Sequence, residues 1–175
     1  MTDPAERPNT IPWPPLILVA AALLAFGLGR LAPLPLPGGP IRVGAGAIAC
    51  LAALGLDLVA MTAMRRARTN ILPTRPALTL LTDGAFALSR NPIYLGNALL
   101  LAGLGLVFGE GWFLVAALAA SLLVDRLAIR REEAHLAARF GEAWRAYAAT
   151  TPRWIGPIGR RPAGRDGERP VNAGR

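Results

Sequence analysis

The sequence predicts an all-α polytopic membrane protein with about four transmembrane helices and a cytoplasmic amphipathic helix near the C-terminus. Hydrophobic residues make up 53% of the 175 residues and the mean hydropathy is +0.40, which is more apolar than a soluble domain of this size needs to be. The apolar residues gather in runs that approach the length of a membrane span, and turns rich in Pro and Gly separate the runs. Together these observations favour a helical bundle in lipid.

The charge of the chain also has a membrane explanation. The formal net charge is +8, and all 19 basic residues are Arg. In a soluble protein this balance is typical of nucleic-acid binding. Here apolar runs separate the arginines, so topological signalling and binding of anionic lipid explain them better, and we expect no nucleic-acid partner.

The single cysteine, Cys50, lies in an apolar run, which predicts a buried structural thiol.

Residues 1–12 predict a disordered N-terminus, and residues 13–64 predict a two-helix membrane anchor. The first segment is acidic and Pro-rich and lacks the basic region of a cleavable signal peptide, so we expect the first apolar run to stay in the membrane. The two spans are residues 14–31 and residues 41–64. Between them, residues 32–40 contain four prolines and two glycines and predict a turn.

Asp57 is an acidic residue inside the second span. An acid at that depth is costly, so we expect it to face protein and to be paired or protonated. A polar contact explains Asp57 more simply than a catalytic role does. A small transporter built on this acid is an alternative function, which depends on this one residue.

Residues 65–91 predict a cytoplasmic loop, because five arginines oppose one acidic residue there. A third span, residues 92–108, follows, with Asn91 as its N-cap and a proline at its first position. After a turn at residues 109–111, residues 112–124 predict a fourth span. Both runs are at or below the usual length of a span, so they form a short helical hairpin in this interpretation.

Arginine placement predicts the orientation. Five arginines lie in the 65–91 loop and eleven follow Val124, whereas two flank the first turn. This excess places that loop and the C-terminus in the cytoplasm, and four spans then place the N-terminus there too. We therefore expect an integral protein of the bacterial inner (cytoplasmic) membrane. Residues 156–175 are rich in Gly, Pro and Arg and predict a disordered basic tail.

Residues 125–148 predict a cytoplasmic helix that carries charge into its own apolar face. Its predicted buried stripe consists of Ile129, Leu136, Phe140, Trp144 and Tyr147. At 100° per residue, Glu133 and Arg126 fall in this stripe and Glu132 flanks it, whereas His135 projects from the solvated half. A carboxylate in such a stripe needs a partner. Two explanations stay open: an ion network that fixes helix packing, or a binding site for a polar or cationic ligand.

Two polar segments carry a resemblance to a known family. Residues 89–96 read Ser-Arg-Asn-Pro-Ile-Tyr-Leu-Gly and open the third span. The second segment contains Glu132-Glu133, Phe140-Gly141, Trp144, Tyr147 and Pro152-Arg153-Trp154. By the order and spacing of these motifs, about residues 70–155 resemble the integral-membrane methyltransferases related to isoprenylcysteine carboxyl methyltransferase and the phospholipid N-methyltransferases. The resemblance implies a methyltransferase-like core over residues 65–155.

The resemblance also implies S-adenosylmethionine bound at the cytoplasmic membrane face, and no metal. The cofactor-binding residues expected from it are Arg90, Asn91, Tyr94, Gly103, Gly105, Glu132 and Glu133. The expected catalytic residues are Arg126, Arg130 and Glu133. Carboxylates and phenols suit the ammonium, sulfonium and ribose hydroxyls of the cofactor, and an Arg fork suits its carboxylate. We expect Tyr94 and Glu133 to converge on this site.

Two residues depart from the family pattern. Asn91 stands where the family often has His, and Trp144 replaces the first of two aromatic residues. With Asn91 unable to titrate and His135 expected in water, the sequence shows no evident general base. A carboxylate or thiolate acceptor is therefore favoured over an amine, reached from the lipid bilayer as a lipophilic or small molecule. The alternative of another class is a non-catalytic membrane scaffold that binds lipid or a partner.

Overall fold

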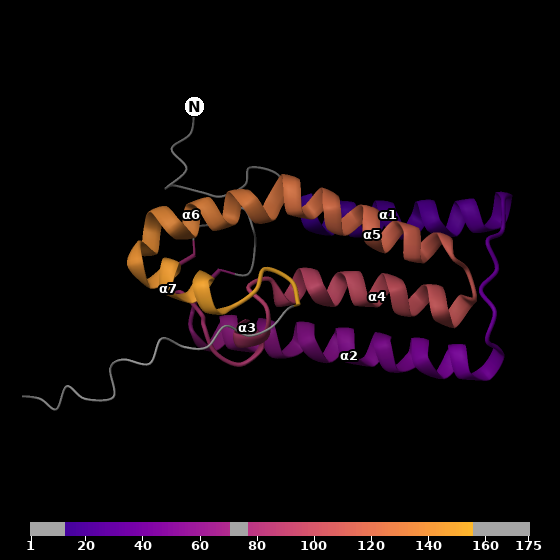
Figure 1. The fold of residues 1–175 in the computed structure, drawn as a ribbon, viewed down its shortest axis with the longest axis horizontal. Coiled ribbons are helices and arrows are strands. Elements are labelled where there is room, and N and C mark those ends of the chain that lie inside the picture. The colour runs from indigo at the N-terminus through magenta and orange to yellow at the C-terminus, as the bar shows by residue number, and fades with distance from the viewer. Residues whose placement is uncertain (1–12, 71–76, 156–175) are drawn as a thin grey trace, which may run out of the picture.

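The computed structural model describes residues 13–70 and 77–155 and confirms the all-α membrane fold (Figure 1). The four apolar helices of the bundle are α1 (Trp13–Leu31), α2 (Gly39–Arg66), α4 (Pro92–Phe108) and α5 (Trp112–Val124). Three helices, α1, α2 and the one that begins with α5, are long and apolar enough to cross a membrane, and α4 is a shorter apolar helix of 17 residues. The predicted N-terminal segment and C-terminal tail lie outside the described residues, as does Arg75.

Proline and glycine set the bounds of α4 as the sequence predicts. Pro92 occupies the first position of α4, where its missing N–H costs nothing. Gly109 ends the helix with φ +72°, a conformation that favours glycine. Asn91 is the N-cap residue of α4, as predicted, although its side chain makes no cap hydrogen bond to the helix. The Asn91 amide instead donates to the Arg153 carbonyl at 3.0 Å.

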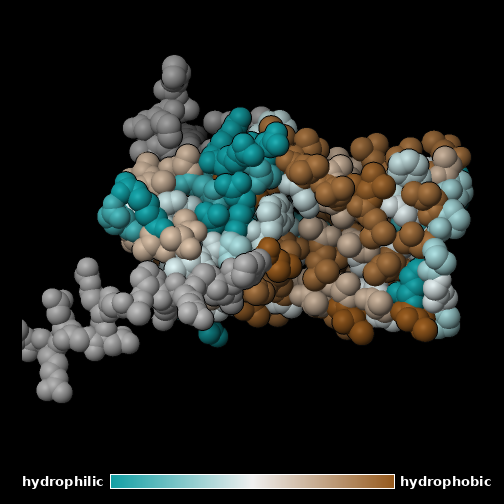
Figure 2. Space-filling view, in the orientation of Figure 1, coloured by the Kyte–Doolittle hydropathy of each residue, from teal (hydrophilic) through white to brown (hydrophobic). Residues whose placement is uncertain are grey.

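Helix α4 lies at the centre of the bundle, with α2 along one side and α5 along the other, and α1 packs against α5 (Figure 1). The buried core includes Ile17, Ala25, Leu101, Phe113 and Ala117. Many other apolar side chains face outward; Leu23 and Leu51, for example, are 66% and 69% exposed. Figure 2 shows this hydrophobic surface over most of the bundle, with hydrophilic residues gathered around α6. So much exposed apolar surface fits contact with lipid.

The two turns at the far end of the bundle bind each other. The Glu110 carboxylate accepts a hydrogen bond from the Leu34 N–H at 3.0 Å, and the Gly111 N–H donates to the Leu34 carbonyl at 2.7 Å. The Trp112 indole donates to the Ala32 carbonyl at 2.7 Å. These bonds connect the α1–α2 turn to the α4–α5 turn and join the two helix pairs into one bundle.

Helix α5 continues beyond its apolar part without a break. It passes through a π-helical segment, η1 (Asp125–Ile129), into α6 (Arg130–Phe140), and α7 (Glu142–Thr150) follows after Gly141. The predicted single helix over residues 125–148 is therefore wrong at both ends. It begins as the continuation of the fourth span, and Gly141 ends it with φ +53°, a conformation that favours glycine.

The break at Gly141 turns α7 back toward the short helix α3 (Ala85–Leu88), which precedes α4 (Figure 1). The Tyr147 hydroxyl of α7 donates to the Phe86 carbonyl of α3 at 2.6 Å. The turned-back helix thereby brings the end of the described chain to the beginning of α4, where the candidate site lies.

Candidate small-molecule site

A cavity of about 380 Å³ lies at the end of the bundle where α1 and α4 begin and α2 ends. Residues of α1, α2, α4, α6, α7 and the segment 77–81 line it, and its charged lining residues are Asp57, Arg90, Glu132 and Glu133. The Thr69 hydroxyl at the end of α2 accepts hydrogen bonds from the N–H groups of Leu78 at 3.0 Å and Thr79 at 3.3 Å. The cavity is within the size range of small-molecule sites, about 300 to 1,000 Å³.

Tyr94 and Glu132 meet on the wall of this cavity. Tyr94 lies in the first turn of α4, and its hydroxyl donates to Oε1 of Glu132 on α6 at 2.6 Å. An O–H···O bond this short is typical of one with a charged acceptor. The bond joins residues 38 positions apart and leaves both oxygen-bearing groups at the cavity. The sequence predicted that Tyr94 would meet Glu133; the bond goes to the preceding glutamate.

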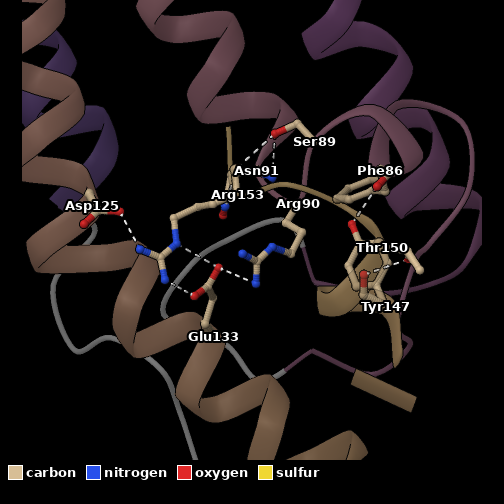
Figure 3. A network of polar contacts seen from close by, with 9 residues as sticks. All are labelled: Phe86, Ser89, Arg90, Asn91, Asp125, Glu133, Tyr147, Thr150 and Arg153. Carbon is tan, nitrogen blue, oxygen red and sulfur yellow. Dashed lines mark hydrogen bonds and ion pairs between the residues drawn. The ribbon is translucent and has the colours of Figure 1, made fainter. Parts of the chain in front are cut away.

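Glu133 lies in an ion network beside the cavity (Figure 3). Its Oε1 is 3.1 Å from Nη1 of Arg90 and 3.1 Å from Nε of Arg153, and its Oε2 accepts a further bond from Arg153. Arg153 also binds Asp125 at 3.1 Å. Its hydrogen bond to Glu133 raises the pKa of the Arg153 guanidinium. An ion network that fixes helix packing is one of the two explanations that the sequence leaves open for these acidic residues. The sequence does not predict that Arg153 belongs to this network.

Backbone and polar side chains connect the two segments that carry the family resemblance. The Arg90 N–H donates to the Pro152 carbonyl at 2.9 Å. The Ser89 hydroxyl and the Asn91 amide both donate to the Arg153 carbonyl, at 3.1 and 3.0 Å. Ser89 is fully buried and Asn91 is 8% exposed. Asn91 therefore contributes hydrogen bonds that do not need a titratable ring.

Arg90 connects this network to the cavity. Its guanidinium carbon lies 5.6 Å from the ring centroid of Trp144, a cation–π distance, and its Nη1 binds Glu133. Its Nε is buried and has no hydrogen-bond partner among the described residues. A buried donor without a partner is destabilising, and Arg90 itself lines the cavity.

The two glycines expected at the cofactor lie instead between helices. A Cβ at Gly103 would lie 2.7 Å from Sγ of Cys50 and 3.0 Å from the Gly46 carbonyl on α2. At Gly105 it would lie 2.9 Å from Cβ of Phe113 on α5. Neither glycine lines the cavity. Close packing against α2 explains Gly103 and close packing against α5 explains Gly105, as is usual for small residues in membrane helices.

The two arginines expected to be catalytic also lie outside the cavity. The side chains of Arg126 and Arg130 are 67% and 53% exposed, and both approach Asp125, at 3.9 and 3.0 Å. The expected position of Arg126 in the buried stripe is wrong, because the π-helical segment changes the angle between successive residues there. Their geometry fits support of the ion network rather than contact with a ligand in the cavity.

The expectation that His135 is solvated is wrong. Its side chain is 1% exposed, and it lines the cavity three residues after Glu132, which places both on one face of α6. The prediction assumed one straight helix over residues 125–148. The break at Gly141 turns α7 back, so that α6 and α7 enclose one cavity.

Among the described residues, no group of three His, Cys, Asp or Glu side chains is placed to hold a metal ion.

The fold defines a polytopic helical membrane protein, and the cavity at one end of its bundle is a candidate small-molecule site with charged residues set in a mainly apolar lining. The family model for phospholipid methyltransferases matches residues 41–143, more than half of the chain and most of the cavity wall. The chain belongs to this family of membrane methyltransferases. Comparison with the curated proteins and with the solved structures gave no significant match.

Proposed function

We propose that the protein uses S-adenosylmethionine to methylate a lipophilic or small acceptor in the cavity at the cytoplasmic membrane face. The observation that carries the proposal is the Tyr94–Glu132 hydrogen bond of 2.6 Å on the wall of that cavity. It supports a ligand site because a carboxylate and a phenol converge from two helices where a methyltransferase family model matches.

The groups at the cavity fit this cofactor. Glu132 and Tyr94 provide oxygen acceptors for an ammonium or for ribose hydroxyls. Arg90 lines the cavity, and a guanidinium suits a carboxylate. Glu133 would act through Arg90, because its two oxygens already bind Arg90 and Arg153. In the proposed site Glu133 is thus a positioning residue, whereas Glu132 contacts the ligand.

S-adenosylmethionine would supply a methyl group on a sulfonium, which leaves the protein to orient the reactants and exclude water. The buried rings of Trp144 and Tyr147 exclude water along one wall of the cavity, and their contact, with ring centroids 5.7 Å apart, keeps that wall rigid. The hydrogen bond from Tyr147 to the Phe86 carbonyl fixes α7 against α3. Both contacts involve α7, which is not one of the apolar helices of the bundle, and they hold this wall of the cavity in place.

The titration of detergent-purified protein with S-adenosylhomocysteine tests the proposal by calorimetry. We expect the wild type to bind. Tyr94→Phe and Glu132→Gln should each weaken binding by about tenfold, or about 1.4 kcal/mol, because the first removes a hydroxyl and the second a negative charge from the cavity wall. Glu142→Gln is the matched control, since Glu142 is exposed and pairs with Arg145; its affinity should equal that of the wild type.

Absence of binding in folded wild-type protein would contradict the proposal and favour the non-catalytic scaffold. Binding that neither Tyr94→Phe nor Glu132→Gln changes would place the cofactor elsewhere. Folding of each variant is checked by its circular dichroism and its elution from a sizing column.

A further inference from the structure

Three exposed arginines stand together at the end of α2. Arg65 and Arg66 belong to the last turn of the helix, and Arg68 follows it two residues later. None of them lines the cavity. Among the described residues, none of the three forms an ion pair, whereas the arginines of the network beside the cavity do. Like charges this close repel one another, so a nearby anion would stabilise this arrangement.

The backbone of Arg68 is in the left-handed region, with φ +50°, and it is the one residue other than glycine with positive φ in the described part of the chain. Its N–H donates to the Arg65 carbonyl at 3.1 Å, and the Thr69 N–H donates to the Met64 carbonyl at 3.0 Å. This is the hydrogen-bond pattern of a Schellman motif, in which glycine is the usual residue at this position, because a side chain there is strained. The helix dipole favours basic residues in the last turn of a helix, but it gives no reason for an arginine in place of glycine after that turn.

The lipid-facing surface of α2 leads to these arginines. Leu51, Leu54 and Leu58 are 69%, 55% and 64% exposed. At 100° per residue, the three leucines and Arg65 lie within about 60° of one another around the helix. Arg65 stands about 10 Å beyond Leu58 along the axis, at 1.5 Å per residue. An acyl chain that lies against the leucines therefore places its headgroup at the arginines.

We propose that the end of α2 binds an anionic phospholipid, whose phosphate lies among the three arginines and whose acyl chains lie along the three leucines. Guanidinium groups bind phosphate oxygens with paired hydrogen bonds, and basic residues next to a membrane helix attract anionic headgroups. A headgroup with net negative charge suits this site better than a zwitterionic one, whose cationic group would approach the same arginines. The site lies on the outer surface of α2, so the inference does not depend on the proposed methyl transfer in the cavity.

Native mass spectrometry of the full-length protein in an uncharged detergent tests the inference. Dioleoyl phosphatidylglycerol and dioleoyl phosphatidylcholine are titrated separately, and the bound fraction gives an apparent Kd for the first molecule of each lipid. Both lipids have the same chains and a phosphate, so the ratio of the two Kd values measures the preference for net negative charge. We expect the wild type to bind phosphatidylglycerol more tightly by about tenfold or more, because each basic residue at an anionic surface contributes about fivefold.

Two double variants locate this preference. Arg65→Gln/Arg66→Gln should lower the affinity for phosphatidylglycerol by about tenfold or more. Its affinity for phosphatidylcholine should not change, which also shows that the variant is folded. Arg139→Gln/Arg145→Gln removes the same charge from exposed positions of α6 and α7 and should change neither affinity. Equal affinities of the wild type for the two lipids, or equal losses in the two variants, would overturn the inference.

Arg68→Gly separates lipid binding from the structure of the turn. Glycine favours φ +50°, so this variant should unfold at a higher temperature than the wild type in lipid-free detergent. Its affinity for phosphatidylglycerol should nevertheless fall by about fivefold. A more stable variant that binds phosphatidylglycerol as well as the wild type does would overturn the inference.

A soluble headgroup distinguishes a lipid site from a site for free phosphate. Glycerophosphoglycerol has the headgroup of phosphatidylglycerol without its acyl chains. At the same concentration as the lipid it should not displace phosphatidylglycerol from the wild type, because it cannot contact the leucines of α2. Displacement would show that the arginines bind a free phosphate ester, which would overturn the assignment to a lipid.

Discussion

Two adjacent glutamates of α6 have different environments, and this difference decides their roles. Glu132 lies against Tyr94 at 2.6 Å, and Glu133 lies between Arg90 and Arg153. Successive residues of a helix point about 100° apart, so two neighbouring carboxylates can serve a cavity and a packing network at once. The network of Glu133 also holds the end of the described chain to Asp125 through Arg153.

Substitution at these two positions should therefore separate stability from ligand affinity. Glu133→Gln removes a charge from two arginines and should lower the free energy of unfolding by about 2 kcal/mol, since hydrogen bonds to charged groups contribute about 1.5 to 3 kcal/mol. Glu132→Gln should lower affinity for S-adenosylhomocysteine more than it lowers stability. Thermal unfolding in detergent and calorimetry measure the two effects. Glu142→Gln should change neither, because its exposed pair contributes little. Equal losses of stability in the two variants would contradict these separate roles.

At the residue scale, sequence reasoning predicted that the two polar segments meet but did not identify every contact between them. The predicted convergence of the segment around Tyr94 with the acidic pair agrees with the structure, because both motifs flank apolar runs that end on one side of a bundle. The helical wheel placed Glu133 inside the buried stripe and Glu132 at its flank, whereas in the structure Glu132 meets Tyr94 and Glu133 lies in the ion network. Arg153 follows the last helix, where no periodicity indicates the direction of its side chain.

At the scale of elements, the contact between α2 and α4 depends on glycines. A Cβ at Gly46 would lie 2.7 Å from the Val107 nitrogen and 2.8 Å from the Gly103 carbonyl. These are backbone atoms, which cannot move without moving α4. The Gly96 position leaves room for Asp57 in the same interface. Gly103, one of the two glycines that resemble a cofactor motif, is thereby explained by the approach of the α2 and α4 backbones.

Gly46→Ala should thus lower the free energy of unfolding by about 1 to 3 kcal/mol, as overpacking does. Gly55→Ala on the same helix is the matched control, since a Cβ there meets nothing within 4 Å. It should leave stability unchanged or raise it by up to about 1 kcal/mol, because Ala favours helix. Differential scanning fluorimetry in detergent compares the two variants. An equal melting temperature for both would show that the glycine contact does not limit the approach of α2 to α4.

The bounds of α4 and the beginning of α5 could be predicted because Pro92 and the turn from Gly109 to Gly111 start or stop a helix by covalent geometry. The break at Gly141 could not, since glycine also occurs inside helices and only tertiary contacts show that this one adopts φ +53°. The error had a consequence for the site. A straight helix leaves His135 in water, whereas the turned-back α7 encloses it.

At the scale of the whole molecule, the two ends of the bundle differ in charge. The cavity end carries Arg65, Arg66, Arg68, Arg90 and the arginines of α6 and α7, whereas Arg30 and Arg42 lie near the far end. Arg42 also donates to the Leu106 and Val107 carbonyls at the end of α4. Its guanidinium therefore has a structural role, because it satisfies carbonyl groups at a helix end. The asymmetry favours a cytoplasmic position for the cavity, where the proposed cofactor would have access to it.

Thiol labelling of intact cells tests this orientation. In a Cys50→Ala background, Pro37→Cys places an exposed thiol in the α1–α2 turn, and Arg145→Cys places one on α7. A membrane-impermeant maleimide should label position 37 in intact cells and position 145 only after permeabilisation, because arginine-rich segments stay in the cytoplasm. The reverse pattern would place the cavity outside, away from cytoplasmic S-adenosylmethionine. It would contradict both the orientation and the proposed reaction, since a correctly folded cavity on that side could not be supplied with the methyl donor.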